Sequence, residues 1–121
     1  MGINAGPDII EDGLVLCLDA ANSKSYPGTG TVWTDRSANG LNGTLVNSPS
    51  FSTENGGSIV FDGSDDYVSF STSPLTFSSS NFSVECIFRT TTNEIDVMTG
   101  HGPAGAGGGD WWLGVNANGK L

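Results

Sequence analysis

Asn-Gly pairs constrain this chain more than any other feature of its sequence. Four pairs occur, at residues 39–40, 42–43, 55–56 and 118–119, among 18 glycines in 121 residues. Asn and Gly adopt positive φ more readily than other residues, so the pair is a strong signal for a tight turn between strands. No segment shows the 3.6-residue apolar repeat of an amphipathic helix. The sequence therefore predicts an all-β protein of short strands joined by tight turns.

Apolar patterns place the expected strands. Residues 13–20 (GLVLCLDA) are apolar on both faces as far as Asp19, which predicts a central strand. The other expected strands are residues 43–46, 57–63, 66–71, 81–91, 94–100 and 110–116. Residues 57–63 and 66–71 are expected to form a hairpin, and the strict alternation in 81–91 predicts a half-buried strand. The arrangement favours an antiparallel two-sheet β-sandwich.

The charge balance excludes several classes of partner. The chain carries 13 acidic residues against four basic ones, for a formal net charge of −9. A nucleic-acid-binding protein needs a basic surface, so no nucleic-acid partner is expected. No apolar run reaches membrane-spanning length, and the N-terminus shows no signal peptide, so no membrane insertion is expected. The acidity fits cation binding, or solubility alone.

Three stretches of the chain resemble a known superfamily. They are residues 12–51, 56–70 and 81–90, with a first strand ending in Asp, a loop Asp-x-Ser-x-Asn-Gly-x-x-Gly at 35–43, and Phe-Asp-Gly-x-x-Asp-Tyr-Val at 61–68. This pattern resembles the concanavalin A-like lectin/glucanase superfamily in its laminin G-like branch, most closely modules of structural and fibre proteins of tailed phages, especially marine ones. The resemblance implies a jelly-roll sandwich over residues 12–121, preceded by an N-terminal arm at 1–11.

The resemblance also implies strands that the chain lacks. Modules of this branch run beyond 121 residues, whereas this sequence stops just after the Asn-Gly pair at 118–119. Unpaired sheet edges invite pairing with another chain. The C-terminal strands are therefore expected to be missing and the sandwich to be completed by a neighbouring subunit, with the arm at 1–11 as one strand donor.

The expected function follows from this resemblance. The leading hypothesis is a non-catalytic structural or adhesion module, a subunit of a virion, fibre or extracellular assembly whose partners are copies of itself or other structural subunits. The alternative is a carbohydrate-binding, lectin-like module that attaches to host glycans. A remnant β-glucanase-like domain is the third reading, because this fold supports all three.

One motif bears on catalysis. Glu94 and Asp96 are similar to the Glu-Ile-Asp-x-x-Glu strand of retaining β-glucanases in the superfamily, which implies a nucleophile and an orienting Asp. A retaining glycosidase also needs a second carboxyl group as acid/base, and this chain has Thr99 at that position. His101 is the single histidine and is expected in a solvated glycine-rich loop, so it offers no catalytic triad. No enzymatic activity is expected.

A calcium site is the one cofactor hypothesis. Ca²⁺ prefers six to eight oxygen ligands from carboxylates, amides and carbonyls. The candidate ligands are Asp35, Asn39, Asp62, Asp65 and Asp66, from two expected loops. The alternative is that Asp35 and Asp62 cap turns through neighbouring backbone amides. Both interpretations stay open from the sequence.

Sugar binding would depend on exposed aromatic rings. The candidates are Tyr26, Trp33, Trp111 and Trp112. Trp111 and Trp112 are adjacent in an expected strand and so face opposite sides of it, whereas Trp33 is expected to close one end of the sandwich. Cys17 and Cys86 lie in separate strand patterns and are interpreted as two half-buried free thiols rather than a disulfide.

Overall fold

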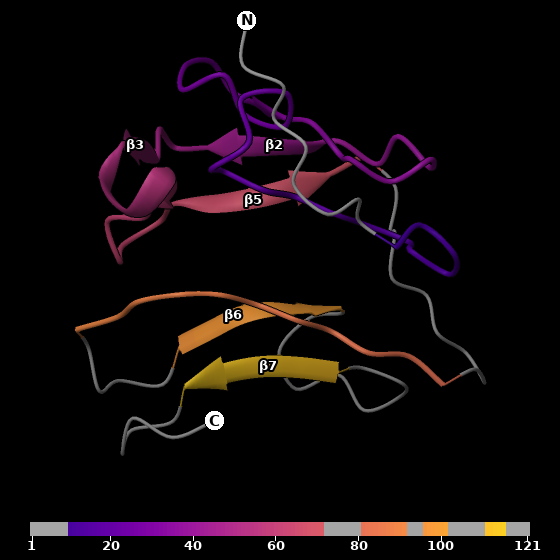
Figure 1. Ribbon diagram of the computed structural model, residues 1–121. Coiled ribbons are helices and arrows are strands. Elements are labelled where there is room, and N and C mark those ends of the chain that lie inside the picture. Colours follow the sequence, from indigo (N-terminus) through magenta and orange to yellow (C-terminus); the bar gives the residue numbers. More distant parts are fainter. Residues whose placement is uncertain (1–9, 72–80, 92–95, 102–110, 116–121) are drawn as a thin grey trace, which may run out of the picture. The chain divides into compact units, whose positions relative to one another are not determined.

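The computed structural model describes residues 10–71, 81–91, 96–101 and 111–115, and it confirms an all-β protein (Figure 1). These residues form strands β1 to β7 and a single 3₁₀ turn, η1. The chain divides into two compact units, Met1–Pro74 and Leu75–Leu121. No helix among the described residues is long and apolar enough to cross a membrane. The predicted arm at 1–11 lies almost wholly outside the described residues.

A three-stranded antiparallel sheet forms the centre of the first unit. It contains β1 (Val32–Trp33), β2 (Gly43–Val46) and β5 (Tyr67–Phe70) in the order β1-β2-β5. In Figure 1, β2 and β5 lie side by side. The register aligns Gly43 with Phe70 and Val46 with Tyr67. The strand predicted at 43–46 is therefore confirmed, and it is the middle strand of this sheet.

The sheet has an apolar inner face and a mixed outer face. Paired residues on neighbouring antiparallel strands share a face, and residues two apart along a strand do as well. The register places five residues on the inner face: Trp33, Gly43, Leu45, Val68 and Phe70. We define the outer face as Val32, Thr44, Val46, Tyr67 and Ser69. Leu45 is only 5% exposed, which identifies the inner face as the core side.

Gly43 is a packing glycine rather than a turn glycine. A Cβ at this position would lie 2.6 Å from Val68 Cγ1 and 3.6 Å from Leu18 Cδ1. A real carbon atom cannot come so close, so the sheet reaches this packing because residue 43 has no side chain. The pair at 42–43 therefore does not form the turn predicted from its sequence. The turns predicted at 39–40 and 55–56 are present, with Gly40 at φ 66° and Gly56 at φ 92°.

The predicted hairpin of residues 57–63 and 66–71 is wrong in its pairing. Both strands form, as β4 (Ser58–Val60) and β5, but β4 pairs with β3 (Ser50–Ser52). The 3₁₀ turn η1 (Glu54–Gly56) joins β3 to β4. Residues 61–66 therefore carry the chain from one sheet to another. Local alternation predicts that a strand forms, but its partner is chosen by packing elsewhere in the unit.

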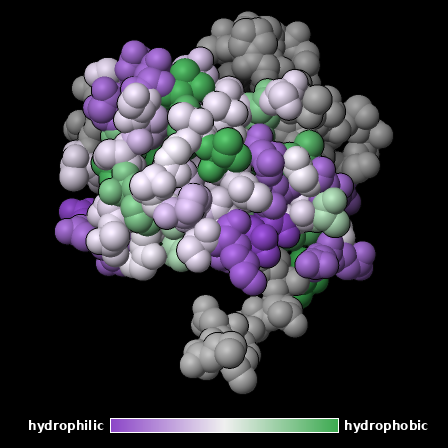
Figure 2. Space-filling view, turned by 90° about the horizontal axis from the view of Figure 1, so that it is seen from above, coloured by the Kyte–Doolittle hydropathy of each residue, from purple (hydrophilic) through white to green (hydrophobic). Residues whose placement is uncertain are grey.

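Residues 13–20, expected to be a central strand, form no strand. The segment is half-buried from Leu14 onward, and Leu18 reaches the position of Gly43 on the inner face of the sheet. Its backbone groups bond to side chains of a loop instead of to a ladder, as described below. Figure 2 shows one face of the molecule, on which hydrophobic residues lie mostly as separate areas among hydrophilic and neutral ones.

In the second unit, β6 (Asp96–His101) and β7 (Trp111–Val115) form an antiparallel pair. The strands expected at 94–100 and 110–116 are thus present within their described parts. Residues 81–91, expected to be a half-buried strand, form no strand and are exposed throughout. An alternating pattern does not by itself fix a strand, because strand formation depends on the tertiary context.

Candidate functional site

The carboxylate of Asp35 organises the loop that follows β1. Its Oδ1 accepts hydrogen bonds from the Cys17 amide at 2.9 Å and the Ser37 amide at 2.8 Å. Its Oδ2 accepts from the Ser37 hydroxyl at 2.6 Å and the Leu41 amide at 2.9 Å. The residue is 5% exposed. Four donors therefore surround a buried carboxylate, which matches its full acceptor capacity of about four lone-pair sites.

The same loop holds residues 14–17 in place. The Ser37 hydroxyl and the Asn39 side-chain amide both lie 3.0 Å from the carbonyl oxygen of Val15. Asn39 Nδ2 also donates to the carbonyl oxygen of Leu14 at 3.1 Å, and the Arg36 amide donates to that of Cys17 at 2.8 Å. Buried backbone groups need partners. The loop supplies them, so the first segment is anchored without a strand neighbour.

Asn42, at the C-terminal end of the loop, bonds back to Asp35. Its side-chain Oδ1 accepts a hydrogen bond from the Asp35 amide at 3.0 Å. Asp35, Ser37, Asn39 and Asn42 thus form one hydrogen-bonded set, which we call the Asp35 loop. Sequence reasoning identified Asp35 and Asn39 but missed Ser37 and Asn42. The polar spacing Asp-x-Ser-x-Asn-x-x-Asn is the signal that could have found them.

Hydrogen bonding determines the ionisation of Asp35. Burial by itself would raise the pKa of this carboxyl group, but the bonds from Ser37, Cys17 and Leu41 together outweigh burial and lower the pKa. A hydrogen bond to the charged form favours that form. The neighbouring Cys17 thiol has a raised pKa, chiefly because it is desolvated and secondly because Asp19 and Asp35 are negative, while Arg36 opposes the shift. Asp35 is therefore a carboxylate at neutral pH, and Cys17 is a thiol.

The two cysteines carry free thiols. Cys17 is half-buried, as expected, whereas Cys86 is exposed.

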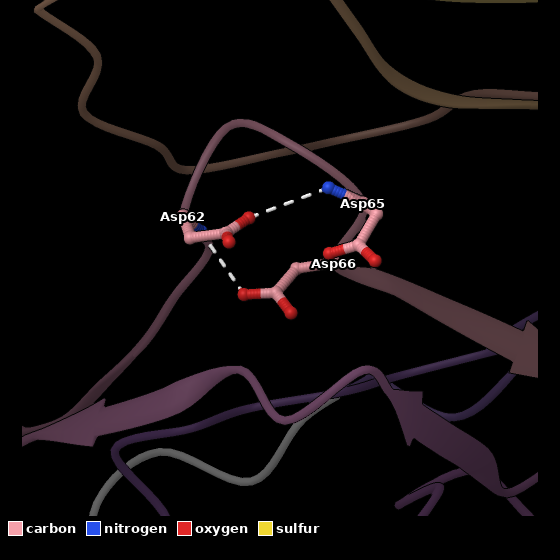
Figure 3. A group of neighbouring side chains, drawn as sticks. All are labelled: Asp62, Asp65 and Asp66. Carbon is pink, nitrogen blue, oxygen red and sulfur yellow. Dashed lines mark hydrogen bonds between the residues drawn. The ribbon is translucent and has the colours of Figure 1, made fainter.

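The turn between β4 and β5 brings three carboxylates together (Figure 3). Oxygens of Asp62, Asp65 and Asp66 lie within 4.8 Å of one another. Asp62 Oδ1 accepts from the Ser64 amide at 2.8 Å, and Asp66 Oδ2 accepts from the Asp62 amide at 3.0 Å. Asp62 and Asp65 are exposed. The group can offer oxygens to a cation, while its hydrogen bonds already account for a turn-forming role.

The structure separates the five calcium candidates into two sets. Asp62, Asp65 and Asp66 share the β4–β5 turn, whereas Asp35 and Asn39 belong to the Asp35 loop. Because backbone and hydroxyl donors already occupy the Asp35 carboxylate, it acts as the turn cap that was the alternative interpretation. Among the described residues, the three turn carboxylates are the group that could offer oxygens to a cation.

Two of the four aromatic candidates for sugar binding lie in the first unit. Tyr26 is 4% exposed, its ring packs 5.5 Å from that of Phe51, and its hydroxyl donates to the Gly30 carbonyl oxygen at 2.8 Å. This ring has no open face for a sugar. Trp33 is half-buried on the inner face, and its Nε1 is buried with no hydrogen-bond partner among the described residues. Both residues serve packing.

The remaining candidates lie in the second unit. Trp111 and Trp112 are the first two residues of β7, paired with His101 and Gly100. His101 is thus the last residue of a strand, not a loop residue as expected. Asp96 pairs with Val115 and Thr99 pairs with Leu113, and the register shifts at a bulge between Val97 and Thr99. Glu94 lies outside the described residues.

Comparison of the chain with family models, curated proteins and solved structures found no match.

Proposed function

We propose that this chain is a non-catalytic β-module that works as a structural or adhesion subunit of a larger assembly. The main support for this proposal is the exposure of apolar side chains on the outer face of the β1-β2-β5 sheet. Val32 and Tyr67 on this face are 51% and 52% exposed, and Val46 lies between their strands. Apolar side chains that are exposed together on one face of a sheet can form an interaction site if they make a contiguous patch. In the described residues only Tyr26 and Leu45 are buried apolar side chains.

The sheet edge supports the same proposal. β5 ends the described part of the sheet on one side, so its outward backbone groups can receive a strand from another chain. The other end, β1, is flanked by Ser25, whose carbonyl oxygen accepts from the Thr34 amide at 2.8 Å. The partners would be copies of the same chain or other structural subunits, on a virion or an extracellular surface as the sequence resemblance implies.

A concanavalin A-like jelly roll is part of the proposal. Its support is the connection at residues 61–66, which joins consecutive strands of different sheets, β4 and β5. Consecutive strands of a jelly roll change sheets in this manner. The resemblance to laminin G-like modules supports the same architecture.

The assembly role can be tested by sedimentation velocity of the full chain over a range of concentrations. We expect reversible self-association that weakens in a Val32→Thr, Tyr67→Ser double variant. Val60→Thr is the matched control, because Val60 is 45% exposed but lies in the other sheet of the unit. A monomer at every concentration, with no binding to particles or fibres from its source, would refute the proposal.

Carbohydrate binding is the second candidate function. The adjacent positions of Trp111 and Trp112 in β7 favour it, because neighbours in a strand face opposite sides, so at most one of the two can be a core residue. A glycan array would show saturable binding that Trp111→Ala or Trp112→Ala abolishes. Hydrolysis is not proposed, because Thr99 cannot act as acid/base at neutral pH. Release of reducing sugar from laminarin that disappears in Glu94→Gln would contradict this.

A further inference from the structure

Three of the four Asn-Gly pairs lie in described residues, and their side chains have different surroundings. Asn-Gly is the dipeptide most open to attack on the Asn side chain by the next backbone nitrogen, because glycine has no Cβ to block the approach. The reaction requires the side chain and the following peptide to move out of their folded positions. Hydrogen bonds and packing at each pair therefore control its rate.

Two pairs are held by the Asp35 loop. Asn42 Oδ1 accepts from the Asp35 amide at 3.0 Å, and Gly43 after it is buried in β2, where the closest approach leaves no room for a Cβ. Asn39 Nδ2 donates to two backbone carbonyl oxygens, at 3.0 and 3.1 Å. Neither side chain can reach its reactive geometry until these bonds open.

Asn55 lies in a different environment. Asn39, Asn42 and Asn55 are all exposed residues, but Asn55 is the one whose side chain has no hydrogen-bond partner among the described residues. Asn55 itself has φ 54° inside the 3₁₀ turn η1, a left-handed conformation that Asn adopts more readily than most residues. Gly56 follows at φ 92°. The side-chain amide of the third pair is therefore not held by a hydrogen bond to the described residues, unlike those of Asn39 and Asn42.

We propose that Asn55 is the site of spontaneous deamidation in this protein, and that the Asp35 loop protects Asn39 and Asn42. The Gly56 nitrogen loses its proton and bonds to Asn55 Cγ, while the Cγ–Nδ2 bond breaks and ammonia leaves. Water then opens the succinimide ring at either carbonyl, which gives aspartate or isoaspartate. Each product adds one negative charge to a chain whose formal net charge is −9.

The isoaspartate product would disturb the packing of the turn. A Cβ on Gly57 would lie 2.7 Å from the Ala20 carbonyl oxygen and 3.0 Å from Ala21 Cα, so this turn rests directly on the backbone of residues 20–21. Isoaspartate lengthens the backbone by one carbon atom, which the close contact cannot absorb without a shift. The modified chain is therefore expected to melt at a lower temperature than the unmodified one.

The test compares the three pairs within one molecule. The full chain is incubated at mildly alkaline pH, in buffer and in denaturant, and conversion at each Asn is followed by mass spectrometry of chymotryptic peptides. In the folded chain Asn55 should convert at least about tenfold faster than Asn39 or Asn42, because their hydrogen bonds must open first. In denaturant the three rates should converge, since all share the same dipeptide.

Two variants test whether Asn55 is the fast site and whether the Asp35 loop protects the other two. Asn55→Gln should abolish the fast conversion and leave the other two rates unchanged. Asp35→Ala should raise the rates at Asn39 and Asn42 toward that of Asn55, whether it opens the loop locally or unfolds the unit. Conversion of Asn39 or Asn42 in the folded wild-type chain as fast as that of Asn55 would overturn the proposal.

Discussion

Asp35→Ala is the substitution that tests the structure most directly. It removes an acceptor for four hydrogen bonds and leaves the Cys17, Ser37 and Leu41 amides without their partner. A buried donor left unsatisfied costs about 1–3 kcal/mol. Cys17, Ser37 and Leu41 are all half-buried, so water will partly replace the lost acceptor at each amide. We therefore expect the free energy of unfolding to fall by about 3–5 kcal/mol, a large part of the roughly 5–15 kcal/mol of a typical domain.

Denaturant titration followed by circular dichroism measures this loss, and amide hydrogen exchange locates it. Exchange at Cys17 should accelerate, because that amide is bonded to the Asp35 carboxylate. Asp62→Ala is the matched control, since Asp62 also caps a turn but is exposed. It should cost less than about 1 kcal/mol. If Asp35→Ala and Asp62→Ala lose the same stability, or if Cys17 exchange is unchanged, the reasoning about the Asp35 loop is refuted.

Three further predictions follow from particular contacts. The pKa of Asp35 is lowered in the folded protein. The contribution of its carboxylate to the free energy of unfolding is therefore complete above the unfolded pKa of about 3.9 and is lost as the pH falls through the folded pKa. The difference in melting temperature between wild type and Asp35→Ala should therefore shrink below pH ~4. Gly43→Ala should lower the free energy of unfolding by about 1–3 kcal/mol through overpacking, and adding Val68→Ala should partly restore it. If the effects of the two substitutions are purely additive, the 2.6 Å approach to Val68 Cγ1 is not the cause. Tyr26→Phe should cost about 0.5–1.5 kcal/mol for the lost bond to Gly30, measured by thermal melting, and an unchanged melt would show that this hydroxyl bond contributes nothing.

The sequence alone determined the all-β class. Helical periodicity is missing, and the glycine and Asn-Gly content demands tight turns, so these local properties suffice for secondary structure. The strand at 43–46 and the turns at 39–40 and 55–56 follow from such signals. Asp35 as a turn cap was also one of the two interpretations open from sequence, because an Asp hydrogen-bonds nearby amides in any chain.

The tertiary structure decided everything that depends on distant neighbours. The sequence suggests a hairpin for β4 and β5, but a strand cannot reveal its partner, and each pairs elsewhere. Residues 13–20 look like a central strand because burial and strand pairing give the same apolar pattern, yet side chains 18 to 25 residues away bond to the backbone of residues 14–17. Gly43 appears to be a turn residue until Val68 is placed beside it. Hydrogen-bond partners and close packing are properties of residues brought together from different parts of the chain, and only the folded structure specifies them.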